Sequence, residues 1–181
     1  MKKEKLSLKA ESWCNRKIKN PYELIQAIFE FQSLTNFKTN FNQLLKYAFD
    51  KKFEIYTSPM ESLEIFNMLK SLIRASFKIL KNIDKYERIR ETNDVLHSKY
   101  LVYASGLTYE QYLNPYLIFK EVFKEQTLSQ IEFDIQDIME HALGNASSCP
   151  SEDICISFIN INRLLDACWL IFNREIYDED V

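Results

Sequence analysis

A chain of 181 residues that is 46% hydrophobic and 14% aromatic can bury a large core, which excludes a disordered protein. Only two glycines and four prolines occur, too few for the many tight turns of a β-sandwich or β-barrel. The net charge is −3 and no apolar run reaches membrane-spanning length, so we expect a soluble protein without membrane contact.

Charge is unevenly distributed along the chain. Residues 1–19 are rich in Lys and Arg, whereas residues 177–181 are acidic. A basic segment can attract an acidic partner such as RNA, although charged chain ends are more often only solvated. We therefore expect one helical domain over residues 1–181, with a loosely ordered basic segment at 1–19 and an acidic tail at 177–181. No apolar stretch follows the basic start, which predicts a cytoplasmic protein without a signal peptide.

Capping residues and prolines mark the predicted helix starts in chain order. Asn20 and Ser58 each precede a proline and stand three residues before a glutamate, a pattern typical of helix N-termini. The first start leads into short helices at 24–31 and 37–49 that join near residue 35. Further starts are predicted at Thr108, Asn114, Thr127 and Ser151, and stops at Gly106 and Gly144.

Three long stripes of apolar residues recur at helical spacing. They cover residues 58–83, 131–142 and 158–172, and the first is interrupted near Ser76 and Phe77. Residues 84–103 and 116–123 have a helical pattern as well. The sequence thus predicts an all-α, single-domain bundle of six to eight helices, four or five of them long.

A first candidate site combines Arg90 and His97, which are seven residues apart and so share one face of a helix. This arrangement resembles the Arg-x(4–6)-His signature of HEPN ribonucleases, which are all-helical and cleave RNA without metal. The resemblance implies that His97 transfers a proton and that Arg90 stabilises phosphate charge. The alternative is an ordinary Arg and His on a helix surface.

A second candidate site is a metal centre made of Asp134, Asp137 and His141, which fall on one side of their predicted helix. Asp94 and His97 form a similar pair at i, i+3. The alternative is a polar boundary beside an apolar helix face.

Aromatic residues are concentrated before Ser58, and they do not all fit one helix face. Some are expected in the core, while others could contact a partner or line a pocket. The residues concerned are Phe29, Phe31, Phe37, Phe41, Tyr47, Phe49, Phe53 and Tyr56.

Several catalytic classes lack their motifs in this sequence. Two glycines cannot form a Gly-x-Gly-x-x-Gly or Walker A loop, and no Gly-x-Ser-x-Gly elbow occurs. The four cysteines show no CxxC spacing, which favours free thiols. We therefore expect a non-catalytic interaction or regulatory protein that uses no cofactor and binds a protein partner or forms a homodimer. The HEPN-like ribonuclease and the metal-binding bundle remain the alternatives.

Overall fold

The computed structural model describes residues 6–54, 57–86, 106–144, 149–151 and 153–176. These residues form eight α-helices and no strands, which confirms the predicted all-α bundle. The helices are α1 (Pro21–Phe31), α2 (Leu34–Phe49), α3 (Pro59–Leu80), α4 (Ile83–Tyr86), α6 (Tyr109–Leu113), α7 (Tyr116–Glu125), α8 (Leu128–Leu143) and α9 (Ile154–Ile171). Short helical turns lie at η1 (Ala10–Ser12) and η3 (Phe172–Ile176).

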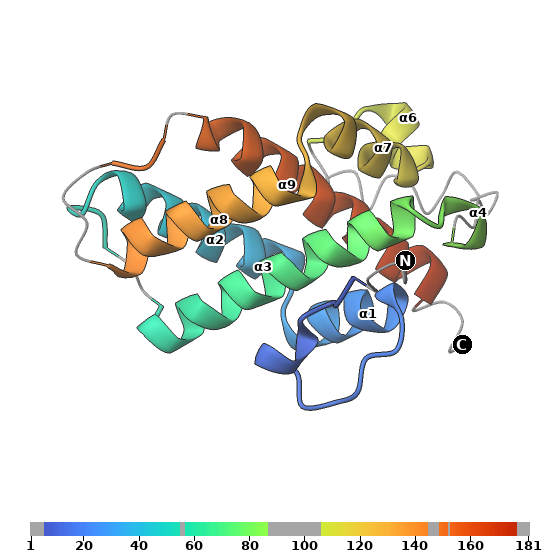
Figure 1. Ribbon diagram of the computed structural model, residues 1–181, viewed down its shortest axis with the longest axis horizontal. Coiled ribbons are helices and arrows are strands. Elements are labelled where there is room, and N and C mark those ends of the chain that lie inside the picture. The colour runs from blue at the N-terminus through green and yellow to red at the C-terminus, as the bar shows by residue number, and fades with distance from the viewer. Residues whose placement is uncertain (1–5, 55–56, 87–105, 145–148, 152, 177–181) are drawn as a thin grey trace, which may run out of the picture.

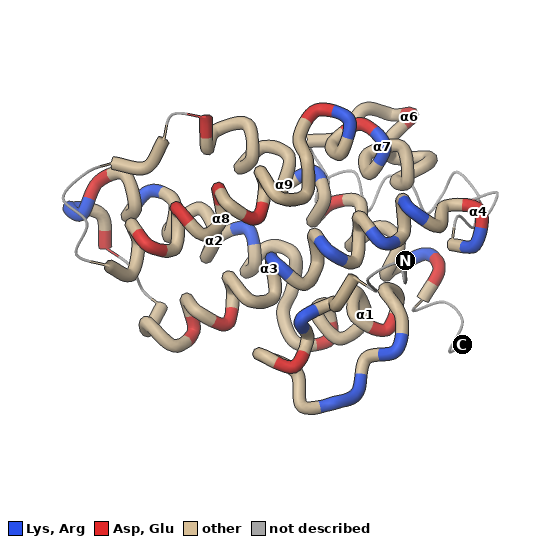
Figure 2. The backbone as a smooth tube through the Cα atoms, viewed as in Figure 1, with Lys and Arg blue, Asp and Glu red and all other residues tan. Residues whose placement is uncertain are grey.

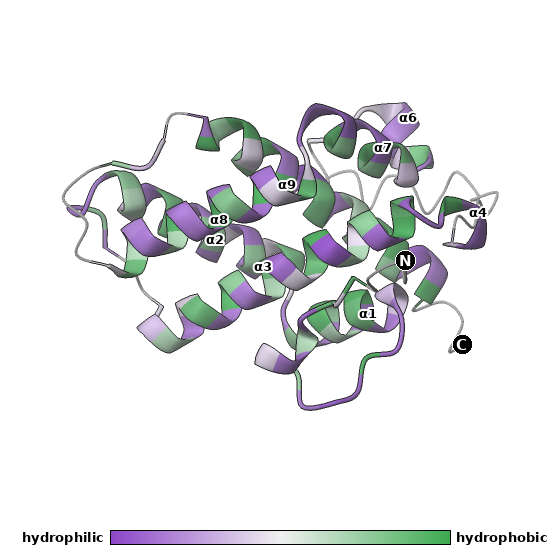
Figure 3. Cartoon of the chain, viewed as in Figure 1, coloured by the Kyte–Doolittle hydropathy of each residue, from purple (hydrophilic) through white to green (hydrophobic). Residues whose placement is uncertain are grey.

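Two long helices, α3 and α9, organise the bundle (Figure 1). Helix α3 contacts α1, α2, α7, α8 and α9, and α9 contacts each of α1, α2, α3, α6, α7 and α8. Helix α2 packs mainly against α8. Apolar and polar residues share most of the helices, as expected of helices that turn one face inward (Figure 3).

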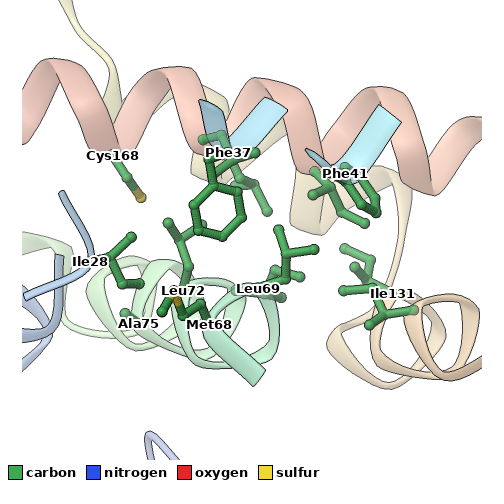
Figure 4. Packing of buried hydrophobic residues seen from close by; sticks show 14 of the residues in the cluster. Ile28, Phe37, Phe41, Met68, Leu69, Leu72, Ala75, Ile131 and Cys168 are labelled. Carbon is green, nitrogen blue, oxygen red and sulfur yellow. The ribbon is translucent and has the colours of Figure 1, made fainter. Parts of the chain in front are cut away.

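The core forms where the inward faces of α1, α2, α3, α7, α8 and α9 meet, and Figure 4 shows part of it. Ile28 comes from α1, Phe37 and Phe41 from α2, Leu72 from α3, and Ile131 from α8. All five side chains are completely buried. Burial of a large apolar side chain stabilises a fold by roughly 1.5–3 kcal/mol relative to exposure. These side chains therefore account for much of the packing that joins the helices.

Helix starts follow the capping residues found in the sequence. Asn20 Oδ1 accepts hydrogen bonds from the backbone N–H groups of Tyr22 (2.9 Å) and Glu23 (3.0 Å), at the start of α1. Ser58 and Glu61 form a reciprocal capping box at the start of α3. Thr108 and Thr127 begin α6 and α8 with capping boxes of their own. These local predictions are confirmed because each needs only neighbouring residues.

One boundary differs from the sequence-based expectation. The join between α1 and α2 lies at residues 32–33, and Ser33 caps α2 by accepting from the Asn36 N–H. Helix α3 is one long helix, as predicted, and Ser76 interrupts only its apolar stripe. The Ser76 hydroxyl donates to the Leu72 carbonyl (2.9 Å) and also contacts Cys168 Sγ (3.3 Å). The polar Ser76 is thus accommodated on the buried face of an unbroken helix.

Helix starts and stops further along the chain are mixed in outcome. Asn114 Oδ1 accepts from the Tyr116 N–H (3.0 Å) at the start of α7. Helix α8 ends before Gly144, as predicted. Helix α9 begins after Asp153, and Ser151 contributes through its carbonyl, which accepts from the Ile154 N–H. The predicted helix at 84–103 is described only over α4, and most of it lies outside the described residues.

The segment Ile154–Ile176, α9 with η3, has the length and composition of a membrane-crossing helix, the single such stretch among the described residues. Most of its apolar window is buried inside the bundle. A core helix covered by other helices has the same composition.

The described part of the basic segment packs on α3. Leu8 and Ala10 are buried. Trp13 Nε1 donates to Ser71 Oγ (2.9 Å), and Arg74 donates to the Ser7 carbonyl (3.1 Å). Residues 7–13 therefore cover part of the α3 surface.

Candidate functional site

Arg90 and His97, the residues of the ribonuclease hypothesis, lie in the stretch 87–105 outside the described residues, as does Asp94. The structure therefore does not test their geometry. The hypothesis stays a prediction.

The proposed metal ligands divide into two sets of contacts. His141 Nδ1 lies 3.0 Å from Asp137 Oδ1, and Asp137 Oδ2 accepts from the Ser151 N–H (3.2 Å). Asp134 instead accepts a hydrogen bond from the Ser157 hydroxyl of α9. Across the described ranges, no group of three or more His, Cys, Asp or Glu side chains is placed to hold a metal ion. The structure therefore pairs Asp137 with His141 and directs Asp134 to a different partner.

Asp134 belongs to a polar network that joins three helices. Gln126, which follows α7, donates to Ser157 Oγ (2.7 Å), and Asn160 donates to Gln126 Oε1 (2.9 Å) and Glu125 Oε2 (3.0 Å). Ser157 and Asn160 are buried. Buried polar groups need such partners because an unpaired one costs roughly 1–3 kcal/mol. The network therefore fixes how α7, α8 and α9 align.

A buried ion pair links α2 to α9. Lys38 pairs with the Asp166 carboxylate, which is almost fully buried. Burial raises the pKa of Asp166 to about 6, against the opposing attraction of the Lys38 ammonium. A Cβ at Gly106 would lie 3.5 Å from Asp166 Oδ2, so the chain passes close to this carboxylate there. The pair holds two helices that are distant in sequence.

A second buried carboxylate, Glu175 of η3, accepts from the Tyr116 hydroxyl (2.5 Å) and from the Tyr22 hydroxyl (3.2 Å). Burial, together with the Glu175 charge, raises the pKa of Tyr116 well above its ordinary value. Tyr22, Lys85 and Glu175 line a surface cleft of about 360 Å³. The hydrogen bonds tie η3 to α1 and α7.

The buried thiol of Cys168 offers no nucleophile. Burial raises its pKa to about 12, despite the contact with the Ser76 hydroxyl. A thiol reacts through its thiolate, which Cys168 does not form near neutral pH.

The strongest candidate for recognition is Phe31 at the end of α1. Its side chain is 65% exposed, whereas Phe29, Phe37 and Phe41 are buried. It borders a cleft of about 430 Å³ and a second cleft of about 330 Å³. We call Phe31 with the residues of the larger cleft the Phe31 surface; these are Trp13, Cys14, Asn15, Arg16, Ala27 and Glu30.

Charges of both signs border the Phe31 surface. Arg16 Nη1 lies 3.1 Å from Glu30 Oε2, and both side chains are about half exposed, at 48% and 45%. Glu30 also accepts from Gln26 Nε2 (2.8 Å). Basic residues lie in the loop before α1, whereas α1 itself carries acidic residues (Figure 2). The second cleft is more polar and includes Glu61 and Glu64.

The sequence pointed to this surface only in part. The crowding of aromatics before residue 58 included Phe31 among candidates for partner contact or a pocket, but did not separate it from core residues. Trp13 and Ala27 were missed, because the loop before α1 meets α1 through folding. One local signal was present: Ala27 and Phe31 are four residues apart and share a helix face.

Comparison of the chain with protein-family models, with curated proteins and with solved structures finds no match in any of the three.

Proposed function

We propose that this protein is a non-catalytic interaction protein that binds a protein partner through the Phe31 surface. The observation that carries the proposal is a phenylalanine that is 65% exposed and bordered by two clefts. A single exposed apolar residue is normal on a protein surface, but an aromatic anchor beside a cleft is typical of an interface hot spot.

The composition of the surface supports protein binding over small-molecule binding. The larger cleft is open, and its lining combines Trp13, Ala27 and Phe31 with polar Asn15 and Arg16. Interfaces are enriched in aromatic residues and Arg, with polar groups around an apolar centre. The lining of this cleft has the same kinds of residue.

The test uses a photo-cross-linking amino acid at Asn36, which is exposed and borders the second cleft beside Phe31. A matched control carries the same amino acid at Ser129, an exposed position on α8. Both proteins are irradiated in cells that express the chain, with and without Phe31→Ser. We expect the protein with the cross-linker at position 36 to form adducts that disappear with Phe31→Ser. The protein with the cross-linker at position 129 should not form these adducts.

Two results would overturn the proposal. One is the absence of adducts at Asn36, or adducts that persist with Phe31→Ser. The other is cleavage of RNA by the purified protein in EDTA that is lost in His97→Ala, because that would establish the ribonuclease alternative.

A further inference from the structure

Resting on the proposed function, we infer that the partner of the Phe31 surface is a second copy of this chain, bound about a twofold axis. A twofold interface uses the same patch on both copies, so that patch must be complementary to itself. The Phe31 surface meets this condition in shape and in charge.

Shape complementarity comes from a protruding ring beside a hollow. Phe31 projects from the end of α1, and the cleft that it borders has a volume of about 430 Å³. A cavity of about 150 Å³ is enough to take up a benzene ring. A twofold axis beside Phe31 places the ring of each copy in the cleft of the other, against Trp13 and Ala27. Both copies then bury the same exposed aromatic side chain.

Charge complementarity comes from Arg16 and Glu30. In one copy they form an ion pair of 3.1 Å in which both side chains remain about half exposed. A twofold axis lets Arg16 of each copy pair with Glu30 of the other. Two ion pairs within the separate copies are then replaced by two ion pairs between them. Such exposed pairs contribute little to stability, so exchanging them costs little. Because the surface carries both signs of charge, a second copy offers an opposite charge to each of the two residues.

Mass measurement of the full chain by light scattering and sedimentation equilibrium tests the inference. We expect twice the chain mass of 21.6 kDa for the wild type and a concentration-dependent return toward the monomer on dilution. Phe31→Ser is expected to weaken association at least about tenfold, the effect of losing a hot-spot side chain. Phe133→Ser removes an equally exposed Phe (69%) from α8 and is expected to leave the dimer unchanged.

A charge exchange tests the twofold arrangement directly. Arg16→Glu gives a copy with two acidic groups at the interface, and Glu30→Arg gives a copy with two basic groups. Each variant alone is expected to be monomeric, because like charges meet across the axis. Mixed, they are expected to form a heterodimer in which both contacts are attractive. If each substitution only disturbed the fold of its own chain, mixing the two variants would not restore dimerisation.

The inference is overturned if the wild type stays monomeric at concentrations up to about 1 mM, the weak end of the usual affinity scale. It is also overturned if Phe31→Ser dimerises as the wild type does, or if the mixed variants stay apart. The cross-linking experiment distinguishes failure of the dimer inference from failure of the proposed function. Cross-linked adducts at Asn36 that depend on Phe31 but contain a different protein would retain the proposed function and reject the second copy.

Discussion

The Lys38–Asp166 pair makes the stability of the fold depend on pH. The pKa of Asp166 is raised by burial from 3.8 to about 6. A raised carboxyl pKa means that the folded state favours the protonated form, so the contribution of Asp166 to stability is fully present below pH 3.8 and is lost as the pH rises to about 6. A difference of about two pKa units corresponds to roughly 3 kcal/mol.

Lys38→Met should make the free energy of unfolding depend more strongly on pH. Without the ammonium the pKa of Asp166 rises further, and at high pH an unpaired carboxylate is left buried. We expect a loss of roughly 3–5 kcal/mol in the free energy of unfolding at about pH 8, and a much smaller loss at about pH 4, where Asp166 is protonated. Urea unfolding at the two pH values measures the difference.

Lys46→Met is the matched control, because Lys46 lies on the same helix and is exposed. Its effect should be small at both pH values. A loss for Lys38→Met that is equal at both pH values would show that Asp166 does not respond to Lys38.

At the scale of the helix, the capping boxes tie each start to a few neighbouring residues. The backbone N–H and the hydroxyl of Ser58 hold the pKa of Glu61 below its ordinary value. The Ser58 N–H donates to Glu61 Oε2 (2.7 Å), and Ser58 Oγ accepts from the Glu61 N–H (3.2 Å). Helix α3 therefore has a defined first turn.

Ser58→Ala should cost about 1 kcal/mol of unfolding free energy, since it removes the acceptor for an N–H group that no carbonyl in the helix can reach. Ser129→Ala, also in the first turn of its helix and exposed, should change stability by less than about 0.5 kcal/mol. Thermal or urea unfolding compares the two. Equal losses of unfolding free energy in the two variants would mean that the Ser58 cap does not stabilise α3.

Elements were predictable from the sequence where the determining contacts are local. The caps at Asn20, Ser58 and Thr127 need residues only two or three positions away, and all three are present. The polar Ser76 interrupts the apolar stripe of α3 without breaking the helix, because its hydroxyl donates to the Leu72 carbonyl one turn earlier. Local composition alone cannot show whether such a group will be satisfied.

At the scale of the molecule, one core holds the helices together. Phe41 of α2 is completely buried and lies against Phe158 of α9, with ring centroids 5.3 Å apart. Phe41→Ala should therefore lower the free energy of unfolding by roughly 3–5 kcal/mol.

The comparison for Phe41→Ala is Phe133→Ala, the same change at a side chain that is 69% exposed. It should change stability by less than about 0.5 kcal/mol. Unfolding followed by both far-UV and near-UV circular dichroism measures the two variants. Similar losses would contradict the assignment of these phenylalanines to core and surface.

The fold class could be predicted from the sequence, whereas the site could be predicted only in part. Helical periodicity and scarce glycine are properties of the chain itself. The pairing of Lys38 with Asp166 depends on how the helices pack, and so does the cleft that Trp13 and Phe31 both line. Helical periodicity in the sequence does not specify this packing. The aromatic residues before residue 58 illustrate this difference. Their concentration is visible in the sequence, but which of them lie in the core and which on the surface is not.

The position of α9 in the chain also determines when the protein can fold during synthesis. Helix α9 contacts α1, α2, α3, α6, α7 and α8, all of which leave the ribosome before it. Translation at about 5–20 residues per second leaves α3 without α9 for several seconds. The surfaces of the earlier helices that pack on α9 stay uncovered during that interval. The nascent chain can therefore complete its core only after α9 emerges and packs against the helices already made.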